Sequence, residues 1–156
     1  MHFSKIIILI LFSLSFTQVR YSFELDGSFE NNSSDGAFLV GYDKIFWKQK
    51  NVNSGIGFEY SLTESPDDMR FSSLYSIVNY NVEENWNMYS KIGFAICNDD
   101  TNFLSDNIGV LLGFGINYNI MDNFHIEMGY HTSYIEGYEH SRLVYSVIKH
   151  FKFKDE

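Results

Sequence analysis

The sequence predicts an all-β fold, namely an eight-stranded antiparallel up-and-down transmembrane β-barrel that follows a cleaved signal peptide. Three observations support this prediction. Apolar and polar residues alternate along most of the chain, which is typical of strands with two unlike faces. After residue 18, no apolar run approaches the roughly 18 residues that a membrane-spanning helix requires. Finally, the segment that begins at Tyr80 recurs at Tyr118, which indicates a repeated pair of strands.

Residues 1–17 have the composition of a secretory signal peptide. A lysine near the start precedes an apolar segment at 6–16, and the small residues Ser15 and Thr17 are spaced as at a cleavage site. We expect cleavage directly after Thr17, with Ser15 as the alternative position, and a retained anchor helix is the competing interpretation. The remainder, 18–156, is then a single outer-membrane barrel domain.

The overall composition limits the classes of function. Hydrophobic residues make up 45% of the chain and aromatic residues 18%, which is enough apolar surface to argue against a disordered chain. The formal net charge of −9 argues against nucleic acid as a partner, because phosphate binding requires a basic surface. Cys97 is the only cysteine, so the sequence allows neither an intrachain disulfide nor a cysteine metal cluster. We expect no cofactor.

Eight segments have the length and pattern of membrane-crossing strands. In the first, apolar residues such as Tyr21 and Phe23 alternate with polar residues such as Arg20 and Ser22. The segments are near or slightly above the roughly 9–11 residues of a tilted transmembrane strand. In chain order, we expect strands at 20–30, 36–47, 52–62, 69–81, 86–97, 108–120, 124–134 and 141–153. The facing of 69–81 stays open, because its apolar residues fall almost evenly on both faces.

The connections between these strands alternate in length. Short turns are expected around 48–51, 82–85 and 121–123, and longer acidic connections at 62–69 and 98–107. Bacterial barrels have short periplasmic turns and longer outer loops, so the pattern fits an outer-membrane orientation. Two further connections, 31–36 and 136–141, are short for outer loops, which limits what they could bind.

The composition of the polar face favours a membrane barrel over a soluble sheet. A soluble sandwich exposes its polar face and usually fills it with Lys, Glu and Thr. Here that face is rich in Gly, Ser and Asn, which suits the crowded interior of an eight-stranded barrel, while the apolar face carries Phe, Tyr, Ile and Leu on nearly every strand. A soluble periplasmic β-domain or a lipocalin-like barrel is the alternative.

The internal repeat predicts a ring of aromatic side chains at one membrane interface. The segment from Tyr80 to Trp86 matches the segment from Tyr118 to Phe124, with the two tyrosines 38 residues apart, and Tyr42 stands another 38 residues earlier. Each repeat places a tyrosine before a turn and an aromatic residue after it, and such rings favour the headgroup level. We therefore predict an aromatic girdle of these five residues.

The segment 108–135 resembles the closing half of OmpA-like barrel domains. In that family a Gly-x-Gly-x-x-Tyr strand, an Asp-Asn turn and a Gly-Tyr strand recur, and this chain has Gly113-Phe114-Gly115-Ile116-Asn117-Tyr118, Asp122-Asn123 and Gly129-Tyr130. The resemblance implies a small eight-stranded barrel of the bacterial outer membrane.

The end of the chain resembles the terminal strand that the barrel-assembly machinery recognises. Its aromatic close, Phe151 and Phe153, would be the assembly signal. Two features depart from the pattern: Lys149 shares the parity of the outward residues, and Lys154-Asp155-Glu156 follow the last phenylalanine.

Several charged residues fall on the inward face. They are Glu24, Asp26, Glu59, Lys91 and Glu127, with His125 and His131 on the same face. A buried charge must find a partner or become neutral. We therefore predict a structural network in the lumen in which Lys91, the interior lysine, pairs with one or more of the acids. The functional alternative is a gate or a proton path.

A histidine pair is the one candidate metal site, and we expect no metal there. His125 and His150 become cross-strand neighbours if the last hairpin turns between residues 137 and 138, and two imidazoles at that distance could bind a metal ion. No third ligand is evident in the sequence.

A weak catalytic alternative rests on His131-Thr132-Ser133. Lipid A deacylases of the outer membrane are eight-stranded barrels with a His-x-Ser pair near the C-terminus, and in such a site His131 would activate Ser133 while Glu136 or Glu139 oriented the histidine. Two features argue against it. Tyr134 stands where that family has Asn, and we place the pair on the inner face, whereas the family's site faces lipid.

We therefore expect no catalysis, and a structural or surface-interaction role in the bacterial outer membrane. A lipid A deacylase-like hydrolase and a narrow pore are the alternatives. The expected partners are outer-membrane lipid and, during biogenesis, the barrel-assembly machinery, with the chain as a monomer.

Overall fold

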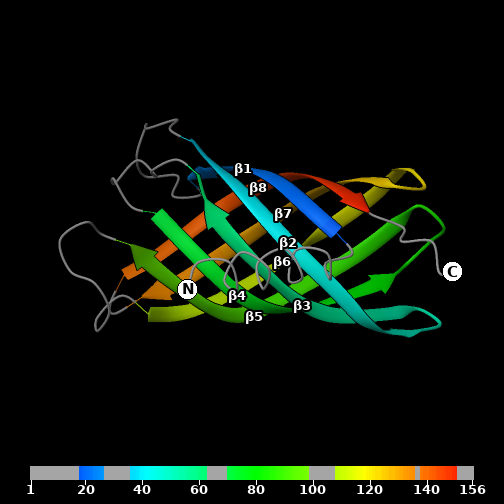
Figure 1. Cartoon of the computed structure of the whole chain (residues 1–156), viewed down its shortest axis with the longest axis horizontal. Helices are drawn as coiled ribbons and strands as arrows, with labels where there is room; N and C mark the ends of the chain where they lie inside the picture. Colours follow the sequence, from blue (N-terminus) through cyan, green and yellow to red (C-terminus); the bar gives the residue numbers. More distant parts are fainter. Residues whose placement is uncertain (1–17, 27–35, 63–69, 99–107, 136–137, 151–156) are drawn as a thin grey trace, which may run out of the picture.

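The computed structural model describes residues 18–26, 36–62, 70–98, 108–135 and 138–150. These residues form a closed barrel of eight antiparallel strands, in which each strand pairs with its neighbours in the chain and the last strand pairs with the first (Figure 1). None of the described residues forms a helix long and apolar enough to cross a membrane.

All eight predicted strands are present. They are β1 (Gln18–Asp26), β2 (Gly36–Gln49), β3 (Val52–Ser61), β4 (Arg70–Asn81), β5 (Trp86–Asn98), β6 (Ile108–Met121), β7 (Phe124–Ile135) and β8 (Tyr138–His150). The largest differences are at the two ends of the chain. β1 begins earlier than expected, and β8 begins at Tyr138 because its first residues continue the ladder with the end of β7. The predicted signal peptide lies outside the described residues, as do residues 27–30 of the first expected strand.

The three short turns lie together at one end of the barrel (Figure 1). Backbone hydrogen bonds tie neighbouring turns to one another: the Asn81 amide donates to the carbonyl of Asn51, and the Asn119 amide donates to that of Asn85. The expected longer connections at 62–69 and 98–107 fall mostly in segments outside the described residues.

The facing of β4, which the sequence leaves open, is settled by burial. Phe71, Tyr75 and Ile77 point into the barrel, while Leu74 and Val78 are exposed on the outside. The pattern is ambiguous in the sequence because part of the interior is itself apolar. A cluster in the lumen joins Phe71, Tyr75, Ile77, Ala95, Cys97, Leu111 and Ile135. Both faces of β4 therefore carry apolar residues.

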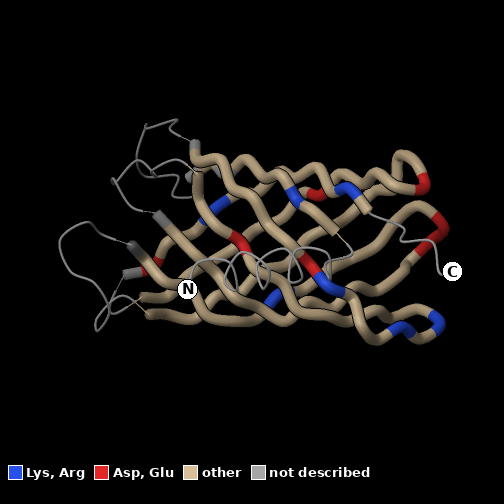
Figure 2. Tube along the Cα trace, in the orientation of Figure 1, with Lys and Arg blue, Asp and Glu red and all other residues tan. Residues whose placement is uncertain are grey.

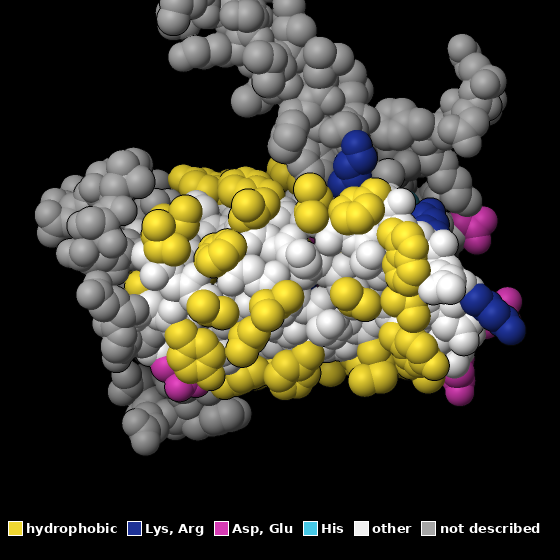
Figure 3. Space-filling model, turned by 90° about the horizontal axis from the view of Figure 1, so that it is seen from below, with side chains coloured by type: hydrophobic (Ala, Val, Ile, Leu, Met, Phe, Trp, Pro, Cys, Tyr) yellow, Lys and Arg dark blue, Asp and Glu magenta, His cyan; other side chains and the backbone are white. Residues whose placement is uncertain are grey.

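The outer surface is apolar over most of its height. Large side chains that would be core in a soluble protein are instead exposed here, among them Phe94 at 61% and Phe114 at 63%. Figure 3 shows them as a band between the two ends, with charged side chains gathered mainly at the end of the short turns. An outward apolar band flanked by polar ends is the surface that a barrel presents to a lipid bilayer.

Close packing inside the barrel requires glycine at several positions, of which Gly129 is one. Gly115 and Gly129 lie opposite each other on β6 and β7, and Tyr89 of β5 lies opposite Gly115 on its other side. The ring of Tyr89 lies over this glycine pair, so that a Cβ atom at Gly129 would meet the Tyr89 hydroxyl and lie 2.7 Å from the carbonyl oxygen of Phe114. An aromatic ring over glycine is a known way to fill the space that a missing side chain leaves in a sheet.

Candidate functional site

The centre of the lumen holds a cluster of charged side chains from six strands. Its members, here called the lumen cluster, are Arg20, Asp43, Glu59, Lys91, Glu127 and Arg142, from β1, β2, β3, β5, β7 and β8. Each is at most 3% exposed. Three are cations and three are anions, so the described cluster is balanced in formal charge. Figure 2 shows charged positions partway along the strands as well as in the turns.

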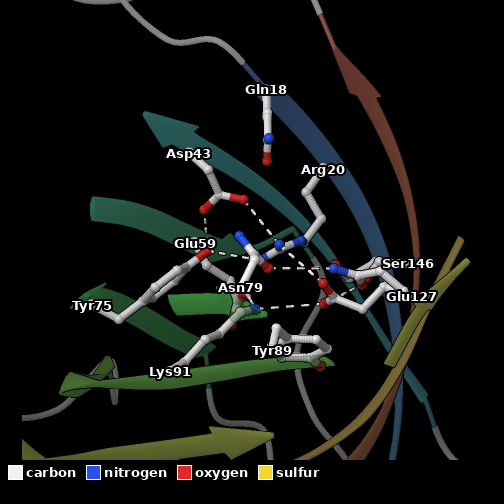
Figure 4. Close-up of polar contacts among 12 residues, drawn as sticks. Gln18, Arg20, Asp43, Glu59, Tyr75, Asn79, Tyr89, Lys91, Glu127 and Ser146 are labelled. Atoms are coloured by element: carbon white, nitrogen blue, oxygen red, sulfur yellow. Dashed lines mark hydrogen bonds and ion pairs between the residues drawn. The ribbon is translucent and has the colours of Figure 1, made fainter. Parts of the chain in front are cut away.

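Arg20 connects two acids on different strands. Its Nη2 atom lies 2.9 Å from Oδ2 of Asp43 on β2 and 3.1 Å from Oε2 of Glu127 on β7. Its Nη1 atom donates to the hydroxyl of Tyr75 at 2.9 Å, and that hydroxyl donates to Oδ1 of Asp43 at 2.9 Å (Figure 4). A guanidinium has several donors in one plane, which lets Arg20 hold these groups at once.

Lys91 connects Glu127 to a third acid. Its ammonium lies 3.4 Å from Oε2 of Glu59 and 3.7 Å from Oε1 of Glu127. The same ammonium lies over the rings of Tyr75 and Tyr89, at 4.7 and 5.4 Å from their centroids, where the negative ring faces favour a cation. Glu127 therefore receives both cations, and Ser146 also donates to it at 3.4 Å.

Arg142 lies nearer the apolar part of the lumen. Its Nη2 atom donates to the Ser133 hydroxyl at 3.2 Å, and its guanidinium lies 5.1 Å from the centroid of the Phe71 ring. His140, two residues earlier on β8, also contacts Phe71, and its ring stacks on the Phe71 ring with centroids 4.6 Å apart. Arg142 thus packs among rings and hydroxyl groups in the apolar section of the interior.

The structure brings together three of the five predicted lumen charges and adds three that the sequence analysis did not place in the network. Glu59, Lys91 and Glu127 meet in the lumen, whereas for Glu24 and Asp26 the structure describes the β1 backbone but not the side chains. The three added residues are Arg20, Asp43 and Arg142. Arg20 could have been found from its parity, since it alternates with outward Tyr21. Asp43 could not, because its strand has apolar residues on both faces.

The three residues of the weak catalytic alternative do not form a catalytic arrangement. His131 and Ser133 are fully buried on the inner face. Nε2 of His131 lies 3.1 Å from the Tyr89 hydroxyl, and Ser133 accepts its hydrogen bond from Arg142. Glu139 is exposed and accepts a hydrogen bond from Ser141. Among the described residues, no hydrogen bond joins His131 to Ser133 or to Glu139.

The histidine pair is close in space, although its register differs from the one considered in the sequence analysis. His125 lies opposite Ile148, so the two histidines meet diagonally, with ring centroids 4.0 Å apart. Nδ1 of His125 is hydrogen-bonded to the side-chain amide of Asn119. Nδ1 of His150 is hydrogen-bonded to the side-chain amide of Gln18 at 3.2 Å. Within the described ranges, no group of three or more metal-ligating side chains is present.

The predicted aromatic girdle is only partly at one level. Trp86 and Tyr118 lie opposite each other on β5 and β6, with ring centroids 4.7 Å apart, and both Tyr80 and Phe124 are exposed on the outer face. Tyr42 differs, because β2 continues past it to Gln49 and so Tyr42 does not end its strand. The exposed aromatic residues of β2 that lie nearest the turn after Gln49 are Phe46 and Trp47. Phe151 and Phe153 lie outside the described residues.

Comparison with known proteins gives a likeness in fold. No family model matches the chain, and no curated protein matches it in sequence. The N-terminal β-barrel domain of Pseudomonas aeruginosa OprF matches with a TM-score of 0.61 at 14% identity, over 88% of this chain and 98% of that one. The Yersinia pestis outer membrane protein Ail matches with a TM-score of 0.60 at 13% identity, over 88% and 99%. A de novo designed transmembrane β-barrel matches with a TM-score of 0.60 at 14% identity, over 88% and 96%.

At such low identity these matches concern the fold alone. Together with the closed topology and the apolar outer surface, they confirm the predicted fold class, an eight-stranded antiparallel transmembrane β-barrel. The resemblance to OmpA-like domains stays a prediction.

Proposed function

We propose that this chain is a small integral protein of a bacterial outer membrane, with a structural or surface-interaction role and with a filled lumen that neither conducts ions freely nor catalyses a reaction. The observation that supports this proposal best is the lumen cluster. Its cations on β1 and β5 reach acids on β2, β3 and β7, so its ion pairs span the interior of the barrel.

A filled lumen follows from the size of the barrel and from this pairing. Eight strands enclose an interior just wide enough for side chains. A permeating ion would have to separate Arg20 from Glu127 or Lys91 from Glu59, and it would leave charges buried without a partner. The cluster therefore acts as a plug in the middle of the barrel.

The proposed setting follows from the outer surface and the charge of the chain. The lipid of the outer membrane would cover the apolar band, and the barrel-assembly machinery would insert the chain. Because the small barrel closes on itself, the chain would be a monomer. The net charge of −9 argues against binding of nucleic acid.

The matched Yersinia protein is named for attachment and invasion. For this chain we propose contact at the cell surface through the acidic connections at 62–69 and 98–107.

A reconstitution experiment tests this function. The purified barrel is inserted into vesicles that contain lipid A, and both the ion leak and the release of fatty acid are measured, with protein-free vesicles as the reference. We expect the leak to stay near that of the protein-free vesicles and no fatty acid to appear. A large leak would contradict the filled lumen. Acyl release that Ser133→Ala abolishes would establish the hydrolase instead.

A further inference from the structure

The end of the barrel with the short turns opens into a polar cavity of about 1110 Å³. This volume is at or slightly above the range of roughly 300–1,000 Å³ that is usual for small-molecule sites. Its floor is Arg20 of the lumen cluster, and Figure 4 shows Gln18 and Asn79 in the same region of the barrel as that side chain. The cavity is therefore a vestibule that ends at the central plug.

The wall of this vestibule is made largely of primary amides. Seven of the fourteen asparagines in the chain line it: Asn51, Asn53, Asn79, Asn81, Asn87, Asn117 and Asn119. Gln18 adds an eighth amide, and His125 and His150 are the other polar residues without formal charge in the lining. These asparagines come from β3, β4, β5 and β6 and from the turn at Asn51, so the amides converge from separate parts of the chain.

The charged residues of the vestibule lie at its floor and its rim. The residues with formal charge that line it, apart from Arg20 at the floor, are at the rim: Lys48, Glu83, Glu84 and Asp122. Between floor and rim the described wall offers donors and acceptors without net charge. A ligand that fits this wall must supply many neutral hydrogen-bonding groups, and the excess of acids at the rim disfavours an anion.

Some polar atoms of the wall and floor are buried without a hydrogen-bond partner. Oδ1 of Asn117 is buried without a hydrogen-bond partner, although the residue is only 6% exposed. The amide–amide hydrogen bonds are long, at 3.5 Å from Asn117 to Asn79 and 3.4 Å from Asn87 to Asn119. Nε of Arg20 at the floor also lacks a partner. Buried polar atoms normally have partners, so this wall is suited to a ligand that supplies them.

We propose that the vestibule is a binding site for a neutral, hydroxyl-rich ligand of the saccharide class. Each primary amide supplies two donors and two acceptor lone pairs, which match hydroxyl groups that both donate and accept. Asn79 and Asn117 lie deepest in the wall, and they are the residues that such a ligand contacts near the plug. The short turns of bacterial barrels face the periplasm, so the ligand comes from there. It is either a free sugar or the glycan of the cell wall.

The test is a calorimetric titration of the barrel purified from membranes. The detergent is zwitterionic, because a maltoside detergent would itself present sugar. The probes are maltotriose, a plain neutral sugar, and chitotriose, which carries the N-acetyl groups of a wall-type glycan. We expect at least one probe to bind with a Kd of about 1 mM or tighter. Binding of maltotriose supports a free sugar, and binding of chitotriose alone supports the glycan.

Variants connect the binding to the vestibule. Asn79→Leu combined with Asn117→Leu is expected to weaken binding at least 10-fold, and a cold-gel check shows whether the variant is folded. If it is not folded, the partly exposed Asn53→Ala and Asn119→Ala serve in its place. Asn85→Ala removes an exposed amide of the neighbouring turn that is not in the lining, and it should bind as the unmodified protein does. No binding of either probe, or equal binding in all folded variants, would overturn the proposal.

Discussion

Replacing Arg20 with methionine should lower the free energy of unfolding of the barrel by about 3–5 kcal/mol, the usual loss when one partner of a buried ion pair is removed. The change removes the guanidinium that lies 2.9 Å from Asp43 and 3.1 Å from Glu127. Both acids stay buried. Methionine keeps much of the length of the side chain, so the loss reports mainly on charge. The measurement is urea unfolding in detergent micelles, followed by the fraction of folded barrel on an unheated gel.

Two further variants separate charge from packing. Lys48→Met removes an exposed cation at the rim of the vestibule and should change stability by less than about 0.5 kcal/mol. Asp43→Asn and Glu127→Gln, added to Arg20→Met, neutralise the two acids that Arg20 pairs with and should restore much of the stability. If the triple variant is no more stable than the single one, the lumen cluster does not hold the barrel through its ion pairs.

Gly129→Ala should destabilise the barrel by about 3 kcal/mol, at the upper end of the usual range for overpacking a core. The added methyl group would meet the Tyr89 hydroxyl and would lie 2.7 Å from the carbonyl oxygen of Phe114, which belongs to the paired backbone of β6 and cannot move far. The clash with Tyr89 would be relieved only by moving its ring, whose hydroxyl is hydrogen-bonded to His131 at 3.1 Å. Urea unfolding again gives the magnitude.

The matched control is another inward glycine with more room. At Gly41 an added Cβ would lie 3.3 Å from the nearest atom, the carbonyl oxygen of Phe58, and 3.5 Å from Cβ of Arg20, so a small adjustment accommodates it. Gly41→Ala should therefore lose much less stability than Gly129→Ala. Equal losses at the two positions would mean that the contact with Tyr89 is not what requires glycine at 129.

The strands could be predicted from the sequence because a barrel of this kind has simple periodic rules. Alternation sets the two faces of most strands, and the short turns and the repeat at Tyr80 and Tyr118 fix the order of the strands. The exception was β4, where the apolar cluster around Phe71 and Leu111 makes part of the lumen apolar. There, a period of two separates inward from outward residues but does not say which set is inside.

The lumen site was harder to predict because charge pairing depends on register and on distance across the barrel. Parity alone placed Glu59, Lys91 and Glu127 inside, but nothing in the sequence says that Glu127 receives both cations. Asp43 was missed because both faces of β2 carry apolar residues. The vestibule could not be predicted either, because its asparagines are scattered over four strands and a turn and meet only when the barrel closes.

The most direct test of the account is the mobility of the protein on a gel without heating. A closed barrel with a paired lumen resists detergent, so the unheated protein should migrate faster than the boiled protein, and the faster band should be found in the outer-membrane fraction. A single band with the same mobility before and after boiling, recovered from the soluble periplasm, would contradict a closed transmembrane barrel and would assign the alternating strands to a soluble sheet.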